Sequence, residues 1–536
     1  MLTAKEVLQK KVSLTVECVD RVYLNGYVKY LQMPGGVVNF IREEKNWAIP
    51  SPQMMKKMSE AFRREVKEFA KSKDIPFVTF GKGDNKAEVA KEHLAHHSGQ
   101  NGVVLIGSAQ EKALGYKSRK ENKDGKVWFH YSRQKVYVTH YYFYIWDENF
   151  GLTFIKVCTY FPFDIKVYFN GHEWAKQQLR QEGIGFEALE NGFAVCDNPE
   201  RLQEICHSLN AEKIRAFFDY WVEELPWPLD AGNRSAGYSH NLSVWQLEVS
   251  HTQVFTDPAQ GRALVEDIIR DNLNIGRPDR VSLLFDRRVT KATPSEFYTR
   301  VIQHGVLPSI RICYKHSALK LYFKDGRAMR IETMINNARD FYINKGLMKN
   351  WDTLVKLGHK INHRMLENLL VSQDCFLPLD TLRTIGKPTK LKNGQRASAM
   401  RFADQRVMAL MATLARHIYI ISTMTNKSLR ESVALLMGLE PDEYPSAKMS
   451  YDLRRLRLKG LLERIPHSHA YSLTDLGLKV AVFFTKLEQH LFKPGLSALL
   501  SDQHYPSALA NALTLVAQEI QVLSDAALIF PIQEAA

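Results

Sequence analysis

The sequence predicts an α/β (or α+β) protein of several domains, on three observations. First, 536 residues exceed what one hydrophobic core usually organises. Second, period-two apolar runs alternate with helical periodicity through the first 235 residues. Third, residues 446–480 are ordered as helix, tight turn, strand, basic tip, strand and helix. We therefore expect an α/β domain over 1–235, a strand-rich α+β domain over 236–372, a basic linker over 373–400, a domain over 401–495 that contains this helix–strand–strand–helix order, and a helical tail over 496–536.

The first region contains the strand and helix patterns of a mixed sheet. The helical run that ends at Glu224 is followed by Pro226-Trp227-Pro228, which breaks the pattern and indicates a boundary near residue 230. An aromatic-dense stretch at 137–146 is typical of a central strand. The expected strands are 12–28, 76–80, 102–106, 136–146, 152–161 and 165–169, and the expected helices are 51–72, 86–97, 173–182 and 210–224.

The second region begins with a helix and continues as strands. The turn Lys324-Asp325-Gly326 predicts a hairpin between two of these strands. Residues 374–400 are rich in Pro, Gly, Lys and Arg and show little periodicity, which favours a linker. The expected elements are a helix at 263–272, strands at 280–285, 296–303, 310–314, 318–323 and 328–336, and a helix at 350–371.

The order of elements in 446–480 resembles the winged helix-turn-helix of bacterial transcription regulators. In that family the second helix enters the DNA major groove, so the resemblance implies DNA as the partner. The helix is expected over about 450–462, with Gly460 at the change of direction and Thr474 as the cap of the closing helix. Residues expected to contact nucleic acid are Tyr451, Arg454, Arg455, Arg457 and Lys459 on the helix and His467 and His469 at the wing tip. A protein-docking role for this domain stays open.

The charge and composition of the chain also favour nucleic acid as the partner. The net charge of +14 and pI of about 9.2 favour a polyanionic partner. Basic residues outnumber acidic ones in 112–135, 311–350, 373–406 and 448–464, so basic surface recurs along the chain. The chain has no apolar run long enough for a membrane span, and its six cysteines are scattered, without a C-x-x-C pair. We expect a cytoplasmic protein that binds nucleic acid, DNA being favoured, and no membrane.

Two further segments could contact a polyanion. Alternation in the hairpin at 314–332 places cations beside aromatic residues, and the candidates are Lys315, Lys320, Tyr322, Lys324 and Arg327. The turn at 80–86 follows a strand and precedes a helix, where glycines and the cations Lys82 and Lys86 suit a phosphate. It lacks the P-loop spacing. Solvated faces and an ordinary strand-to-helix turn are the structural alternatives.

The alternative to a nucleic-acid-binding protein is an enzyme with a catalytic site. Glu111 and Lys112 follow an expected strand end, and Asp147 ends the aromatic strand; two carboxylates and a lysine would suit Mg²⁺-dependent phosphodiester hydrolysis. Surface ion pairs are the other interpretation. His93, His96 and His97 share one expected helix at spacings that suit a metal, but no H-E-x-x-H motif is present. The cofactor and oligomeric state stay open.

Over most of its length the chain resembles a family of uncharacterised bacterial proteins, a likeness that implies no activity. The similar segments are 20–25, 34–40, 109–112, 160–163, 170–171, 276–279 and 285–288. The pattern at 320–332 also resembles rolling-circle replication initiators, but their His-hydrophobic-His metal motif is absent. Three hypotheses result: a DNA-binding protein, a metal-dependent nuclease or other nucleic-acid-processing enzyme of a mobile element or replication system, and a docking protein of a larger assembly.

Overall fold

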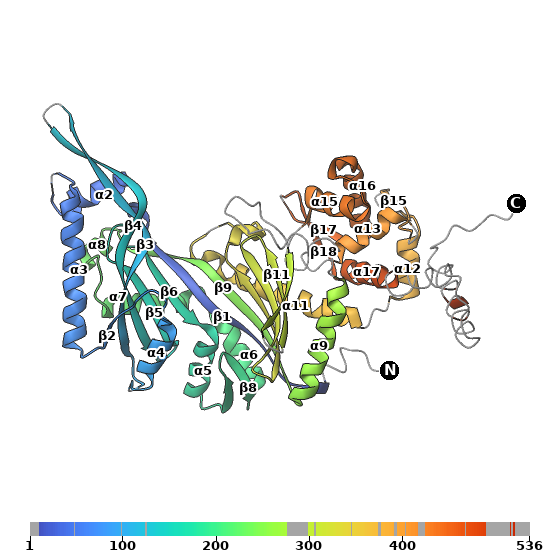
Figure 1. Ribbon diagram of the computed structural model, residues 1–536, viewed down its shortest axis with the longest axis horizontal. Helices are drawn as coiled ribbons and strands as arrows, with labels where there is room; N and C mark the ends of the chain where they lie inside the picture. The colour runs from blue at the N-terminus through green and yellow to red at the C-terminus, as the bar shows by residue number, and fades with distance from the viewer. Residues whose placement is uncertain are drawn as a thin grey trace. The chain divides into compact units, whose positions relative to one another are not determined.

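The computed structural model confirms a multi-domain α/β protein (Figure 1). It describes residues 10–47, 49–97, 99–123, 126–275, 298–304, 307–344, 346–373, 377–390, 394–401, 404–415, 424–466, 468–488, 515, 518–519 and 522. The predicted strand 280–285, the wing residue His467 and nearly all of the tail lie outside these residues. Two compact units are present: residues 14–252 with 332–359, and residues 1–13 with 253–331 and 360–536. We call them the sheet unit and the C-terminal unit.

The sheet unit is organised around strands in the order β9-β1-β6-β5-β4-β3-β2. Neighbours from β1 through β6, β5 and β4 to β3 are antiparallel, whereas β2 is parallel to β3. The strands are β1 (Val12–Val28), β2 (Phe77–Thr79), β3 (Gly102–Lys123), β4 (Lys126–Asp147), β5 (Gly151–Cys158), β6 (Ile165–Asn170) and β9 (His240–Phe255). A separate hairpin comprises β7 (Phe186–Leu189) and β8 (Gly192–Cys196).

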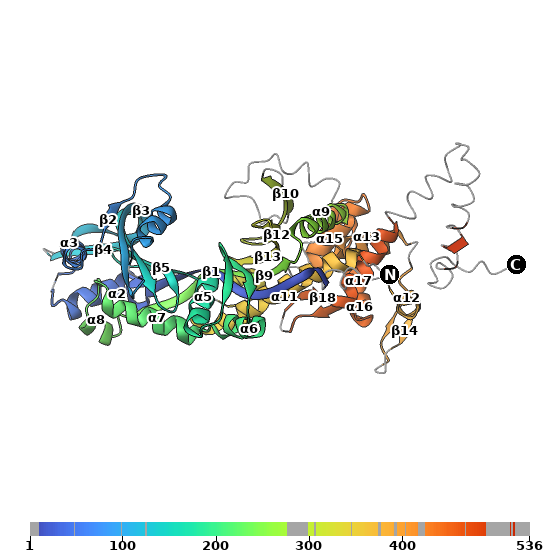
Figure 2. The same ribbon diagram turned by 90° about the horizontal axis from the view of Figure 1, so that it is seen from below.

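Period-two burial explains the packing of these strands. In β5, Thr153, Ile155 and Val157 are buried, while the alternate residues Phe154 and Lys156 are half-exposed. Helices α5, α6 and α7 lie along one face of the unit (Figure 2). The helices are α2 (Pro34–Asn39), α3 (Pro52–Ser72), α4 (Lys86–Leu94), α5 (Gly171–Gln181), α6 (Pro199–Ser208), α7 (Ala211–Glu224), α8 (Ala231–Ser235) and the first residues of α11 (Trp351–Gln373).

Strands β3 and β4 form a hairpin much longer than the sequence predicts. Both strands have 22 residues, and their register continues from Gly102↔Trp146 to Lys123↔Lys126 (Figure 1). Residues 107–112, expected just past a strand end, are therefore in the middle of β3. The outer hairpin is exposed on both sides and so lacks the one-sided apolar alternation from which a strand is predicted.

The C-terminal unit begins with α9 (Pro258–Ile275) and a meander ordered β10-β11-β12-β13, followed by α11 and smaller elements. The predicted turn between β12 and β13 is present, with Asp325 and Gly326 both at positive φ. The strands are β10 (Tyr298–His304), β11 (Leu307–Tyr314), β12 (Ser317–Lys324) and β13 (Ala328–Ile335).

The segment predicted as a basic linker contains regular structure. It includes α12 (Leu379–Gly386) and a short hairpin of β14 (Thr389–Lys390) with β15 (Arg396–Ala397). Lys459 Nζ donates to the carbonyl oxygens of Thr384 and Lys387, at 3.1 and 2.8 Å. These bonds come from the far end of the sequence, so local composition did not reveal them.

Residues 404–488 form what we call the C-terminal module. Among its described residues, a three-stranded sheet in the order β16-β18-β17 is combined with four α-helices. Thr474 caps the last helix as predicted, accepting a bond from Gly477 N at 3.0 Å. The elements are α13 (Gln405–Leu414), β16 (Met424–Thr425), α15 (Asn426–Leu436), α16 (Ser446–Leu458), β17 (Leu462–Arg464), β18 (Ala470–Leu473) and α17 (Asp475–Lys486).

Within the described residues, no helix is both long enough and apolar enough to cross a bilayer. Five of the cysteines are buried free thiols, namely Cys18, Cys158, Cys196, Cys206 and Cys313.

Candidate nucleic-acid interface and the pocket beside strand β2

The exposed face of α16 carries most of the predicted DNA-contacting residues. Tyr451 is 45% exposed. Arg454 and Arg457 are also exposed, as is Lys448 in the first turn. Because residues three apart are neighbours on a helix, Tyr451 lies between Lys448 and Arg454, and Arg454 lies beside Arg457. The four side chains form a stripe that runs obliquely across the exposed side of α16, with Lys448 and Arg457 at its two edges. On the opposite side Met449, Leu453 and Leu456 are buried in the core of the C-terminal module.

Two of the predicted contact residues do not belong to this stripe. Arg455 is 5% exposed and donates to the carbonyl oxygens of Ser398 and Ala399. Its guanidinium also lies 3.5 Å from Asp452, which is fully buried. Arg455 follows Arg454 directly, so its side chain points about 100° around the helix from that of Arg454 and is buried. A buried cation is stable only with hydrogen-bond acceptors, which the two carbonyl oxygens supply.

Lys459 is likewise turned inward. It is 8% exposed, and besides its two carbonyl partners it donates to Thr389 Oγ1 at 3.0 Å. Burial, with the neighbouring Arg455, lowers the pKa of Lys459 to about 8. Arg455 and Lys459 thus attach α16 to the 379–400 segment instead of facing solvent.

Hydrogen bonds between α15 and α16 fix the direction of the exposed helix. Asn426 Nδ2 donates to Ser446 O at 3.0 Å and to Ser450 Oγ at 2.8 Å. In the β17–β18 hairpin, His469 and Arg464 are exposed, and Arg464 Nε donates to Ser468 O at 3.2 Å. On the other flank, register pairs two exposed cations of the β14–β15 hairpin, Lys390 and Arg396.

The strand-rich candidates are only partly exposed. Lys320 and Tyr322 are half-exposed on β12, and register places Lys320 opposite Arg311 of β11. Lys324, predicted on the same face, is buried and pairs with Asp325 at 3.2 Å, because the strand ends there in the turn. Lys315 lies 5.1 Å from the Tyr314 ring centroid, and Arg327 is exposed.

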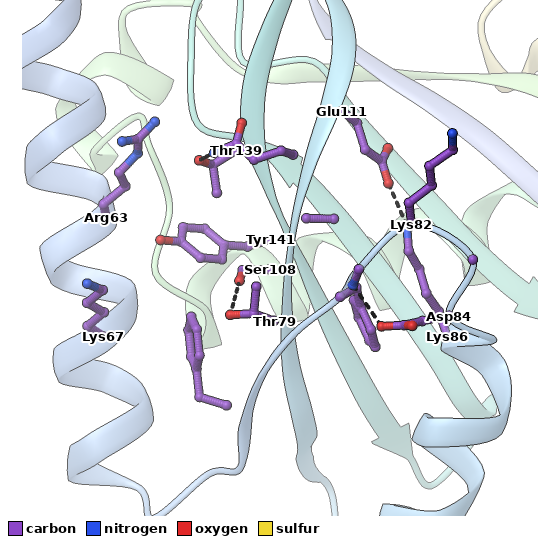
Figure 3. A pocket seen from close by; sticks show the side chains of 16 residues that line it. Arg63, Lys67, Thr79, Lys82, Asp84, Lys86, Ser108, Glu111, Thr139 and Tyr141 are labelled. Carbon is purple, nitrogen blue, oxygen red and sulfur yellow. Dashed lines mark hydrogen bonds and ion pairs between the residues drawn. The ribbon is translucent and has the colours of Figure 1, made fainter.

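In the sheet unit, a cavity of about 860 Å³ lies between α3, the end of β2 and the turn at 80–86 (Figure 3). Asp84 closes the turn by accepting from Gly81 N at 2.7 Å, and Gly83 has a φ of +103°. Asn85 caps α4 by accepting from Glu88 N. Four basic residues line the cavity: Arg63 and Lys67 from α3, Lys82 from the turn, and Lys86 from α4.

Lys86, unlike the other three cations, takes part in a network of hydrogen bonds and ion pairs centred on Glu111. Its Nζ lies 2.5 Å from Glu111 Oε1, which also accepts from Tyr142 Oη at 2.6 Å. Lys156 donates to the second carboxylate oxygen of Glu111. Burial alone would raise the pKa of Glu111, but the bonds from Lys156, Lys86 and Tyr142 outweigh it and hold the pKa at about 2.

The three predicted catalytic residues are not brought together. Glu111 pairs with Val138 in register, and Asp147 lies nine residues further along β4, a separation of roughly 30 Å along a strand. Asp147 is buried, and its Oδ1 closes the β4–β5 turn by accepting from Asn149 N and Phe150 N at 2.9 and 3.0 Å. Its other oxygen accepts from Trp221 Nε1 at 2.8 Å. Lys112, the neighbour of Glu111 in β3, points to the other face and lies 5.2 Å from the Tyr137 ring centroid.

The three histidines considered for a metal do not form a cluster of ligands among the described residues. His93 Nδ1 lies 2.9 Å from Val89 O, one turn back in α4, which is a local side-chain contact. His96 is exposed. The groups whose ligand atoms do converge come from elsewhere in the fold.

Comparison with protein-family models and with curated proteins found no match.

Proposed function

We propose that the C-terminal module is a winged helix that binds duplex DNA, with α16 in the major groove. The observation that carries the proposal is the division of cations on α16. Arg455 and Lys459 are bonded internally, whereas Arg454, Arg457 and Lys448 project into solvent beside Tyr451. A stripe of exposed cations on a helix held rigidly against its neighbour suits a polyanion.

The chemistry of each position supports this assignment. Exposed arginines at Arg454 and Arg457 can make bidentate contacts with guanine O6 and N7. Lys448, in the first turn of α16, suits a phosphate, because the helix N-terminus adds unpaired backbone N–H groups. Arg464 and His469 in the wing, and Lys390 and Arg396 in the neighbouring hairpin, suit the flanking backbone.

The test is duplex binding by the double variant Arg454→Ala/Arg457→Ala. We expect a loss of affinity of about 10- to 100-fold and a weaker preference for guanine at the contacted positions, because both arginines are assigned to base edges. Lys479→Ala is the matched control, because Lys479 is an exposed cation on α17. Equal affinity of the double variant and the control would contradict the proposal.

A protein-docking role for the same helix makes a different prediction. The double variant would then lose a stoichiometric protein partner in affinity capture, while the intact chain would bind duplex no better than the variant at physiological salt. Measuring both properties on the same three proteins separates the two functions.

We also propose that the cavity beside β2 binds a phosphate-bearing ligand. Arg63 Nε is buried without a hydrogen-bond partner, and Lys67 and Lys82 form no ion pair with the described residues. Two carboxylates, Asp84 and Glu111, line the cavity against its four cations, and Glu111 is paired with Lys86. The lining therefore offers unneutralised positive charge, which favours an anion.

Thermal unfolding with and without a nucleoside triphosphate tests this second proposal. We expect the ligand to raise the melting temperature of the wild-type chain, and to leave that of Arg63→Ala/Lys82→Ala unchanged. Lys56→Ala/Lys57→Ala, on the same helix α3 but outside the cavity lining, provides the control. An equal rise in melting temperature in all three proteins would contradict the proposed anion site.

A further inference from the structure

Side chains from three separate elements converge on Glu17 of β1. The two oxygens of its carboxylate have different neighbours. Oε1 lies 2.8 Å from His251 Nδ1 of β9, and Oε2 lies 3.6 Å from His359 Nδ1 of α11. Glu17 and His359 are half-buried and His251 is buried, so the group is sheltered without being closed to solvent.

His207, in the last turn of α6, completes the group. Its ring stands edge-on to the ring of His359, with centroids 5.7 Å apart and planes at 80°. One possible ligand atom each of Glu17, His207 and His359 lies within 4.8 Å of the other two. All three residues belong to the sheet unit.

Gln203 places His207 beside Glu17. Its Oε1 accepts from Glu17 N at 2.9 Å, which fixes the orientation of the amide, and its Nε2 donates to Glu17 O at 2.8 Å. The same Nε2 lies 2.9 Å from His207 Nε2. Because an amide nitrogen only donates, His207 Nε2 accepts this hydrogen bond with its lone pair and is unprotonated, and a metal ion at Nε2 would take the place of the Gln203 donor.

Helix α11, which carries His359, is anchored to helix α6, which carries His207. Trp351, the first residue of α11, is fully buried, and its Nε1 donates to the carbonyl oxygen of Leu209 directly after α6. The helices that carry His207 and His359 are thereby tied together, as α6 is tied to β1 by Gln203. A site held by cross-bonded elements requires little rearrangement to accept an ion.

We propose that Glu17, His207 and His359 bind one divalent transition-metal ion of the Zn²⁺ class. Two imidazole nitrogens and one carboxylate oxygen are a donor set that zinc accepts, whereas Mg²⁺ prefers oxygen ligands alone. His251 holds the second carboxylate oxygen of Glu17 and so acts as a positioning residue. Three protein ligands leave a fourth position for water or another ligand.

The proposal is tested on the full chain after removal of metal. Zn²⁺ and Mg²⁺ are titrated separately by calorimetry, and bound metal is counted by mass spectrometry. We expect one Zn²⁺ per chain, no Mg²⁺ at the same concentration, and a rise in melting temperature with Zn²⁺ only. His207→Ala and Glu17→Gln should each weaken Zn²⁺ binding at least tenfold.

His96→Ala is the matched control, since His96 is an exposed histidine of the same unit outside the cluster. His207 is itself exposed, so its substitution should leave the fold intact, which circular dichroism verifies. Substitution with Co²⁺ adds a second measurement, because its visible absorption should report nitrogen and oxygen ligands and change in His359→Ala. Unaltered Zn²⁺ affinity in His207→Ala, or no Zn²⁺ binding by the folded wild-type chain, would overturn the proposal.

Discussion

At the level of single residues, the functional interpretation of a charged side chain depends on its partners. The sequence predicts Glu111 as a catalytic carboxylate, but Lys86, Lys156 and Tyr142 all bond to it. A carboxylate with a pKa of about 2 stays ionised and is a poor proton acceptor at neutral pH. Glu111 is better understood as the centre of a structural ion-pair network that also orients Lys86 at the cavity.

The first prediction concerns the stability that this network contributes. The folded pKa of Glu111 is below its ordinary value of 4.5, so its contribution is present above pH 4.5 and is lost as the pH falls towards 2. Glu111→Gln should therefore lower the free energy of unfolding by about 2–3 kcal/mol at pH 7 and by much less near pH 3. Urea unfolding at both pH values measures this difference.

Glu190→Gln is the control for that experiment. Glu190 pairs with Lys91 at 3.3 Å, but both side chains are mostly exposed, so its removal should cost less than about 1 kcal/mol. A pH-independent effect of Glu111→Gln would contradict the assignment of its pKa.

The second prediction for a single residue concerns Gly477. A Cβ at this position would lie 2.1 Å from Leu461 O, a backbone atom that cannot rotate away. Gly477→Ala should therefore push α17 from the start of β17 and destabilise the C-terminal module by about 1–3 kcal/mol. Gly35→Ala is the matched control, because a Cβ added at Gly35 would have no atom within 4 Å. Chemical denaturation measures the free energy of unfolding of both variants. Equal values for Gly477→Ala and Gly35→Ala would contradict the packing argument.

At the level of helices and strands, the orientation of α16 is set by contacts from outside it. Its sequence shows five cations between Lys448 and Lys459, and their burial separates them into a solvent-facing set and an inward-facing pair. The inward pair binds the 379–400 segment, so this segment is part of the folded C-terminal unit. The same contacts bring the basic hairpin β14–β15 next to the exposed stripe.

The third prediction follows from the bonds of Lys459. Lys459→Met keeps the aliphatic volume but leaves the carbonyl oxygens of Thr384 and Lys387 without their donor. We expect trypsin to cleave the β14–β15 hairpin, at Lys390 or Arg396, several times faster than in the wild-type chain. Lys479→Met serves as the control, and cleavage at an unchanged rate would show that Lys459 does not hold the hairpin.

Across the whole molecule, the proposed activities fall in different units. The stripe proposed to bind DNA belongs to the C-terminal unit, whereas the cavity proposed for an anion and the proposed metal ligands belong to the sheet unit. Under these proposals, the sheet unit would hold the small-ligand sites and the C-terminal unit the DNA contact.

The fourth prediction uses this separation. Removal of residues 374–536 ends the chain directly after α11, which ends at Gln373. We expect the shortened protein to lose high-affinity duplex binding but to keep its Zn²⁺ stoichiometry and the melting shift with a nucleoside triphosphate. Gel-shift and metal analysis on the same preparation test this expectation. Retained duplex affinity would place the main DNA contact elsewhere in the chain.

Elements whose signal is local can be read from the amino-acid sequence alone. Strand β1 is predicted with its observed limits, and helix α3 to within one residue, because their apolar residues repeat with the period of a strand or a helix over a long run. The order of α16, β17, β18 and α17 is also predictable from the sequence, since Gly460, the turn between the two strands and the Thr474 cap are local signals.

Which side chains meet is a property of the tertiary structure. Glu111 and Asp147 share chemistry but lie far apart on a continuous hairpin, whereas Glu17, His207 and His359, widely spaced in the sequence, have ligand atoms within 4.8 Å of one another. Arg455 and Lys459 resemble Arg454 and Arg457 in sequence, yet their partners are in a segment about 60 to 75 residues earlier. Periodicity fixes which face a residue occupies within its own element, but what covers that face depends on distant parts of the chain.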